Sequence, residues 1–239
     1  MNEGKRIEAH TAKIDEKLNG YYAAPAQPQA AILVLMEAFG ITGHIRGVCD
    51  RLAGLGFAAL APDIFHGRVF AYDDMDAVLP FLKSLDEDAI MNETGRALAW
   101  LRNTAGMPAE KTGAIGFCLG GRLAGRAAIE HADQLGAAVS CYGGGIAAKE
   151  DRFGRAPLTP DFDRLRAPWL LVYGAEDGSI GPDEHGRIAQ ALSERKKRFC
   201  LSLYPEAGHG FLCEERASYA PDAAARAWPE ITGFLGRNL

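Results

Sequence analysis

The chain has 239 residues, of which 48% are hydrophobic and 24% are charged. This length and composition suffice for one sizeable core and predict a single domain over residues 1–239. The net charge of −5 comes without a basic stripe, which argues against nucleic acid as a partner and against a polybasic membrane anchor.

The N-terminal residues 1–19 are polar and lack the apolar segment of a secretory signal. The longest apolar stretch, Ala30–Met36, is far shorter than the roughly 20 residues that span a membrane. The 5 cysteines are widely spaced and include no C-x-x-C pair, so we expect mostly buried free thiols rather than disulfides or a structural zinc site. These features predict a soluble cytoplasmic protein, and they leave open whether it is a monomer or a small homo-oligomer.

Short apolar runs alternate with helical patterns along the chain, which is typical of βαβ units. A hairpin is expected over Arg6–Tyr22, with Asn19-Gly20 as its turn. The elements expected next are a strand over Ala31–Met36, a helix over His44–Leu55, a strand over Phe57–Leu60, a long loop over Ala61–Asp74 and two helical stretches that end near Arg102.

The second half of the chain continues the same alternation. Its expected elements are a strand over Thr112–Phe117, a helix over Leu119–His131, a strand over Ala137–Tyr142, a surface excursion over 146–167, a strand over Trp169–Tyr173, a helix over Asp183–Glu194, a strand over Phe199–Tyr204 and a closing helix over Ala223–Phe234. This order predicts an α/β fold with a mostly parallel central sheet and helices on both faces.

A G-x-C-x-G sequence, Gly116–Gly120, lies where an apolar strand meets a helix rich in small residues. It has the spacing of the G-x-S-x-G turn that presents a nucleophile above a parallel sheet, with Cys118 in place of serine. Free N–H groups at the start of the following helix favour a thiolate, and the N–H of Leu119 is a natural oxyanion donor. The alternative is that Cys118 is an ordinary buried cysteine at a tight turn.

A cysteine nucleophile needs a base, and the base needs an acid to orient it. His209 lies between two glycines directly after the last predicted strand, where its ring can reach the sheet edge. Asp177 follows the preceding strand and is the preferred acid, although Glu176 and Asp183 are near it. The order Cys118, Asp177, His209 is the nucleophile–acid–base order of α/β-hydrolases.

The sequence resembles the dienelactone hydrolase family, also called carboxymethylenebutenolidases, from about Ile32 to Trp228. The resemblance rests on five segments: Met36–Gly40, Ala61–Asp63, Gly116–Gly121, Gly174–Asp177 and Gly208–Phe211. It implies an α/β-hydrolase fold and an enzyme that opens a small-molecule ester or enol-lactone through a thioacyl intermediate, with neither a metal nor an organic cofactor.

The resemblance also implies roles for further residues. Glu37 would contact the resting thiol and help to deprotonate it, and the N–H of Ala38 would be a second oxyanion donor. Phe39 and Phe211 lie in the matching motifs and are expected to contact substrate. The alternative for Glu37 is a solvent-facing carboxylate.

The arginines depart from the family pattern. Family members that act on dienelactone hold the substrate carboxylate with arginines, and one is expected shortly after the catalytic histidine. Cys213 occupies that region here, so Arg68, Arg122 and Arg216 stay candidates for this contact. Two other functions remain open: a broad carboxylesterase or thioesterase on the same triad, and a redox-sensing or binding protein without catalysis.

Overall fold

The computed structural model describes residues 7–239, which contain one eight-stranded sheet. Its strands are β1 (Ile7–Lys13), β2 (Asn19–Pro25), β3 (Ala30–Leu35), β4 (Phe57–Pro62), β5 (Thr112–Phe117), β6 (Ala137–Cys141), β7 (Trp169–Gly174) and β8 (Phe199–Tyr204). The order across the sheet is β1-β2-β4-β3-β5-β6-β7-β8. The β1–β2 and β2–β4 pairs are antiparallel and all other pairs are parallel, which confirms the mostly parallel sheet.

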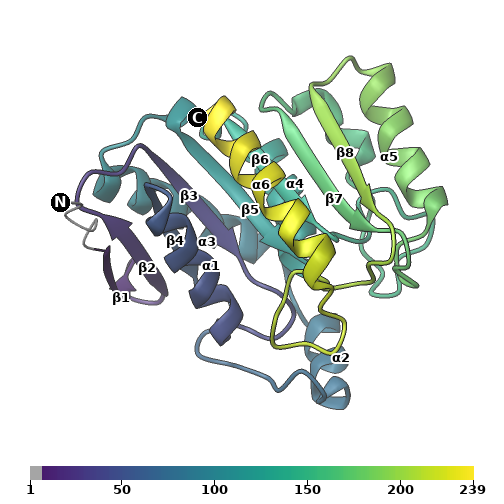
Figure 1. The fold of residues 1–239 in the computed structure, drawn as a ribbon, viewed down its shortest axis with the longest axis horizontal. Coiled ribbons are helices and arrows are strands. Elements are labelled where there is room, and N and C mark those ends of the chain that lie inside the picture. Colours follow the sequence, from purple (N-terminus) through teal and green to yellow (C-terminus); the bar gives the residue numbers. More distant parts are fainter. Residues whose placement is uncertain (1–6) are drawn as a thin grey trace.

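Helices cover both faces of this sheet (Figure 1). They are α1 (Gly43–Gly54), α2 (Met75–Lys83), α3 (Glu87–Ala105), α4 (Leu119–Glu130), α5 (Pro182–Glu194) and α6 (Pro221–Asn238), with short 3-10 helices η1 (Ala109–Lys111) and η2 (Thr159–Arg164). Helices α1 and α6 lie in front of the sheet in Figure 1, and α3 and α4 lie behind it. Every residue of the central strands β3 to β7 is buried, because helices exclude water from both faces.

The N-terminal hairpin is present, but the predicted turn was wrong. Asn19 and Gly20 begin β2, and Asn19 pairs with Lys13. The turn lies just before them, where the carboxylate of Asp15 accepts hydrogen bonds from the backbone N–H groups of Lys17 and Leu18 at 2.7 and 2.9 Å. An Asx-type turn therefore takes the place expected for Asn-Gly. Arg6, where the predicted hairpin began, lies outside the described residues.

The surface excursion over 146–167 contains little regular structure besides η2. It is fixed to the helices behind the sheet by Arg122 of α4, whose side chain is 3% exposed. The Arg122 guanidinium pairs with Glu87 of α3 at 2.9 Å and donates to the carbonyl oxygens of Gly145 and Ala156. A buried ion pair thus holds the excursion against the fold.

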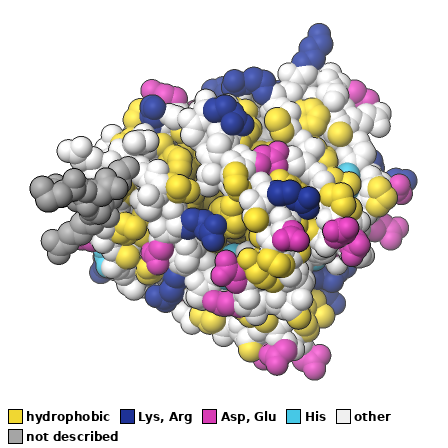
Figure 2. Space-filling view, viewed as in Figure 1, with side chains coloured by type: hydrophobic (Ala, Val, Ile, Leu, Met, Phe, Trp, Pro, Cys, Tyr) yellow, Lys and Arg dark blue, Asp and Glu magenta, His cyan; other side chains and the backbone are white. Residues whose placement is uncertain are grey.

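On the face drawn in Figure 2, basic and acidic side chains are interspersed. Within residues 7–239, no helix combines the length and the apolar character needed to cross a membrane. All five cysteines are free; Cys49, Cys141 and Cys213 are buried as expected, whereas Cys200 is exposed.

Candidate active site

Cys118 occupies a strained turn between β5 and α4. Its φ is 55° and its ψ is −116°, in a region that residues with a side chain rarely adopt. The Cys118 N–H donates to the carbonyl of Cys141 at 3.0 Å, which holds the turn against β6. A Cβ at Gly116 would collide with the carbonyl of Gly120, so the flanking glycines let the turn close.

His209 and Asp177 meet at the edge where the parallel strands end. The Nδ1 atom of His209 lies 2.8 Å from Oδ2 of Asp177. Oδ1 of Asp177 accepts the backbone N–H groups of Ser179 and Ile180 at 2.8 and 3.3 Å, so this carboxylate is fixed in place. With Nδ1–H donated to Asp177, Nε2 is left to face Cys118. Glu176 and Asp183, the two alternatives, are exposed.

The Cys118 thiol and the His209 ring shift each other's pKa in opposite directions. Burial raises the pKa of the thiol, but His209 beside it outweighs burial and lowers the pKa of Cys118. Burial likewise opposes the charge on His209, yet the Cys118 thiolate and Asp177 raise the pKa of its ring to about 10. The resting pair therefore favours thiolate and imidazolium.

Glu37 follows β3 and is fully buried, which excludes the alternative of a solvent-facing carboxylate. Oε1 of Glu37 lies 3.3 Å from Nη1 of Arg216, while Oε2 has no hydrogen-bond partner among the described residues. Burial raises the pKa of Glu37, and the positive charges of Arg216 and His209 act against this rise. The charge of Glu37 also acts on the thiol, since it raises the pKa of Cys118.

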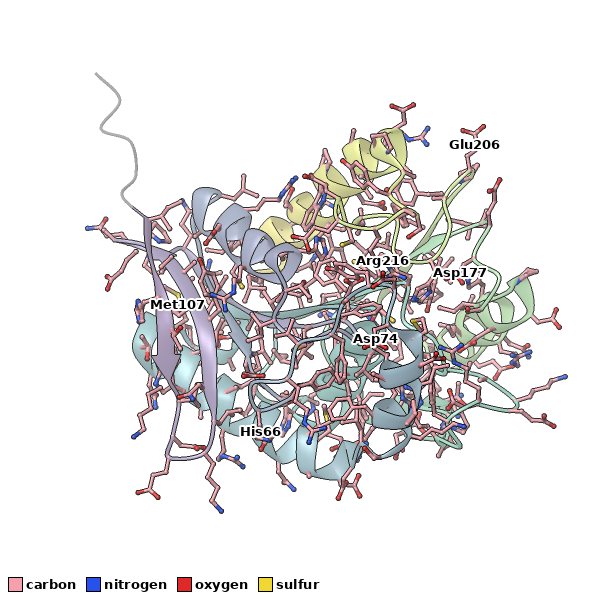
Figure 3. All side chains as sticks on the ribbon, turned by 90° about the horizontal axis from the view of Figure 1, so that it is seen from below. His66, Asp74, Met107, Asp177, Glu206 and Arg216 are labelled. Carbon is pink, nitrogen blue, oxygen red and sulfur yellow. The ribbon has the colours of Figure 1, made fainter. Side chains whose placement is uncertain are left out.

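A cavity of about 560 Å³ opens above Cys118. Ala38 and Leu119, the two expected oxyanion donors, line it together with Cys118 and His209. Phe39 and α2 contribute an apolar part of the lining, and the segment 150–155 of the excursion contributes a charged part. Figure 3, which looks onto this edge of the sheet, shows Arg216 and Asp177 there, with Asp74 at the start of α2.

The loop over Ala61–Asp74 contributes no residue to the cavity lining, whereas Met75 and Leu82 of α2 do. Gly144, Gly145 and residues of the excursion up to Arg155 also line the cavity.

Of the predicted substrate contacts, Phe39 and Arg216 line the cavity. Phe211 does not: it is fully buried against Tyr142 and Tyr204. Arg122 is not a cavity residue either, because Glu87 and two carbonyl oxygens occupy its guanidinium.

Arg68 likewise lies outside the cavity lining, with its guanidinium 5.2 Å from the ring centre of Phe81. The guanidinium of Arg216 stacks over Phe39 at 5.3 Å and lines the cavity, so Arg216 is the candidate for an anion contact among the three predicted arginines. Arg152 and Arg155 line the cavity as well.

Tyr142 was not singled out from the sequence. It follows β6 with a φ of 41°, is fully buried, and places its ring 5.3 Å from that of His209 in an edge-on arrangement. Its place at the carboxyl end of a central strand, directly before three glycines, is the signal that could have identified it. The ring packs beside His209 and restricts where the imidazole can lie.

The strand order, the turn at Cys118 and the histidine after the last strand define an α/β-hydrolase. The family model of the "Dienelactone hydrolase family" matches residues 18–239. The chain belongs to the dienelactone hydrolase family, a family of carboxylic ester hydrolases, and it is an enzyme of that class.

Individual relatives agree with this assignment. A Yersinia pestis protein named "Putative carboxymethylenebutenolidase" is 32% identical over 93% of this chain and 85% of its own length. A Synechocystis protein of the same name is 29% identical over 93% of both chains. Among solved structures, "Putative Dienelactone Hydrolase" from Klebsiella pneumoniae superposes with a TM-score of 0.88, is 29% identical, and covers 97% of this chain and 99% of its own. These similarities confirm the predicted α/β-hydrolase fold.

Proposed function

We propose that this hydrolase opens an ester or enol-lactone through a Cys118–His209–Asp177 triad and a thioacyl-enzyme intermediate. The observation that carries the proposal is the contact between Asp177 and His209 beside Cys118, whose thiol pKa His209 lowers, at a cavity of about 560 Å³ that Cys118 and His209 both line. A thiolate paired with an imidazolium is a ready nucleophile with an acid next to it.

In the acylation step, the Cys118 sulfur forms a bond to the substrate carbonyl carbon. The carbonyl oxygen becomes an oxyanion, for which the N–H groups of Leu119 and Ala38 are the donors we propose. When the tetrahedral intermediate collapses, the C–O bond of the ester breaks, and the leaving oxygen or enolate takes the proton of His209. An enolate suits this site because it is a good leaving group and a thiolate is itself easily expelled.

In the deacylation step, His209 must act as a base. The Cys118 thiolate makes the largest contribution that raises the His209 pKa. Once the sulfur is acylated this charge is gone, so the pKa of the ring falls and the neutral ring can take a proton from water. Hydroxide attack on the thioester then breaks the C–S bond, releases the carboxylic acid and restores the thiolate.

We propose that Glu37 acts on the nucleophile and that Arg216 binds the substrate. The charge of Glu37 raises the pKa of Cys118, so part of the enzyme keeps a protonated thiol, and Glu37 is our candidate for accepting that remaining proton as substrate binds. Arg216 lines the cavity and is our candidate for binding a substrate carboxylate. The names of the relatives as carboxymethylenebutenolidases support a lactone that carries such a group. We further propose a small-molecule substrate and a cytoplasmic location.

The test is a hydrolysis screen of enol-lactones and short p-nitrophenyl esters. The wild-type enzyme, Cys118→Ser and His209→Ala are compared, with Cys200→Ser and His66→Ala as matched controls at exposed positions. We expect Cys118→Ser and His209→Ala to lose activity by about 10³-fold or more. The two control variants should retain it. A thioacyl adduct on Cys118 in rapidly quenched samples would be the direct sign of the intermediate.

The same screen separates the alternatives. Preference for simple esters over lactones would favour a broad carboxylesterase or thioesterase. Full activity of Cys118→Ala, together with iodoacetamide labelling of Cys118 no faster than a model thiol, would contradict the nucleophile assignment and leave the redox-sensing or binding protein.

A further inference from the structure

Three side chains of types that bind metal ions lie together, and Glu37 is one of them. A carboxylate oxygen of Glu37, an imidazole nitrogen of His44 and the sulfur of Cys213 all lie within 4.8 Å of one another. They come from three separate parts of the chain: the end of β3, the first turn of α1 and the loop after His209. The catalytic proposal uses only one of them, Glu37.

Two of these side chains have polar atoms without partners. Oε2 of Glu37 and Nε2 of His44 are both buried and make no hydrogen bond within residues 7–239. Burying such atoms without a partner costs free energy, and buried polar groups in proteins are nearly always paired. Two unpaired atoms in one cluster therefore indicate that a further group belongs there.

The chemistry of the three ligands indicates what that group is. Thiolate, imidazole and carboxylate together suit Zn²⁺, whereas Mg²⁺ and Ca²⁺ prefer oxygen ligands alone. We propose that Glu37, His44 and Cys213 form a binding site for one Zn²⁺ ion, and that zinc bound there inhibits the hydrolase.

A second cavity reaches the cluster at His44. Its volume is about 170 Å³, and its charged lining residues are Glu214, Glu215 and Arg51, whose guanidinium lies 3.7 Å from Glu214. The carboxylate of Glu215 is close enough that its charge raises the pKa of Glu37. The two carboxylates outnumber the single guanidinium in this cavity, which shares no lining residue with the substrate cavity, so a cation can reach His44 by a separate route.

Zinc binding requires the three ligand atoms to move closer together and the Cys213 thiol to lose its proton. Ligand atoms about 2.0–2.3 Å from a tetrahedral zinc lie roughly 3.5 Å apart, so the three atoms must close by about an ångström. The Cys213 thiol, which now donates to the hydroxyl of Tyr72 at 3.4 Å, releases its proton to solvent as the Zn–S bond forms. Water completes the fourth position.

The expected inhibition follows from Glu37. Arg216 is paired with Oε1 of Glu37, and a bound ion would compete with this pair for the carboxylate. A Glu37 carboxylate that is bound to zinc can no longer accept a proton from Cys118, and it can no longer hold Arg216 in position. The inhibitory part of the inference rests on the proposed function, whereas zinc binding itself does not.

Binding is tested in the Cys118→Ala variant, in which the catalytic thiol cannot hold metal. We expect one Zn²⁺ per chain by competition with a chromophoric chelator, and a thiolate-to-metal absorption band when Co²⁺ replaces Zn²⁺. Adding Cys213→Ser or His44→Gln should weaken Zn²⁺ binding by about tenfold or more. Adding Cys200→Ser or His66→Gln should leave it unchanged. Thermal unfolding of each variant shows that it is folded.

The possible results distinguish the metal site from the proposed hydrolase function. Zinc binding that Cys213→Ser and His44→Gln both leave intact would overturn the site, as would a Co²⁺ complex without the thiolate band. Absence of binding in Cys118→Ala would mean that only water fills the cluster. In the active enzyme, Zn²⁺ should inhibit, and folded Cys213→Ser should need about tenfold more Zn²⁺ for the same inhibition. If Zn²⁺ binds but no variant has hydrolase activity to inhibit, the proposed function fails and the metal site stands.

Discussion

The imidazole of His209 is held by a single carboxylate, that of Asp177, at 2.8 Å. The side chain of Asp177 is fully buried, so this contact is shielded from water. It fixes the tautomer of the ring and with it the nitrogen that faces Cys118.

Replacing this carboxylate by an amide tests the contact. We expect Asp177→Asn to fold and to lower kcat by about 10³- to 10⁴-fold, because the amide can hold the wrong tautomer. Steady-state kinetics measure the loss, and Glu176→Gln is the matched control at the exposed neighbouring position. If Asp177→Asn keeps more than a tenth of the activity, another group orients His209.

The Cys118–His209 pair predicts a bell-shaped pH profile. The reactive form needs the thiolate, present above the lowered pKa of Cys118, and the protonated ring, present below the raised pKa of His209 of about 10. We therefore expect kcat/KM to fall at low pH, at a pH below the usual pKa of a thiol, and to fall again at high pH, near pH 10.

Removing the thiolate should lower the His209 pKa. In Cys118→Ala the largest contribution that raises this pKa is absent, so the ring should lose its proton at a lower pH than in the wild type. Imidazole chemical shifts followed by NMR across the pH range measure the difference. An unchanged His209 pKa would mean that the thiol is not ionised in the resting enzyme.

Arg216 should matter most for substrates that carry a carboxylate. We expect Arg216→Met to raise KM for a carboxylate-bearing lactone by roughly tenfold to a hundredfold, because a charge-assisted hydrogen bond is lost. The parallel measurement with a neutral ester controls for the contact between Arg216 and Glu37. An equal effect on both substrates would assign Arg216 to Glu37 alone.

The buried pair between Arg122 and Glu87 should contribute to stability. Arg122→Ala leaves Glu87 and two carbonyl oxygens without their partner, and removing one member of a buried pair typically costs about 3–5 kcal/mol. Chemical denaturation measures the change, with Arg226→Ala as a control on the exposed face of α6. A loss below about 1 kcal/mol would mean that Arg126 and Arg155, which also contact Glu87, replace the missing charge.

The sequence predicted the sheet and the meeting of Cys118, Asp177 and His209 at one edge of it, because both depend on local patterns. Continuous apolar runs indicate strands buried on both faces, and parallel strands end at one edge, so residues that follow them meet there. Cys118 directly follows β5, and Asp177 and His209 come a few residues after β7 and β8, so all three lie at that edge.

Partners that depend on long-range packing could not be predicted in this way. Arg122 and Arg216 are equally plausible arginines in the sequence, and only the fold turns one toward Glu87 and the other toward the cavity. Phe211 comes two residues after His209, yet its ring is buried in the core. The Asn19-Gly20 turn failed because Asp15 forms a competing turn a few residues earlier.

The two walls of the cavity belong to segments outside the sheet. Met75 and Leu82 come from α2, and the charged wall comes from the excursion, whereas Cys118 sits on a turn that the core fixes. Substitutions in these two walls can therefore change substrate preference without moving Cys118. Engineering this enzyme toward bulkier or neutral acyl groups would begin at positions 75, 82 and 150–155.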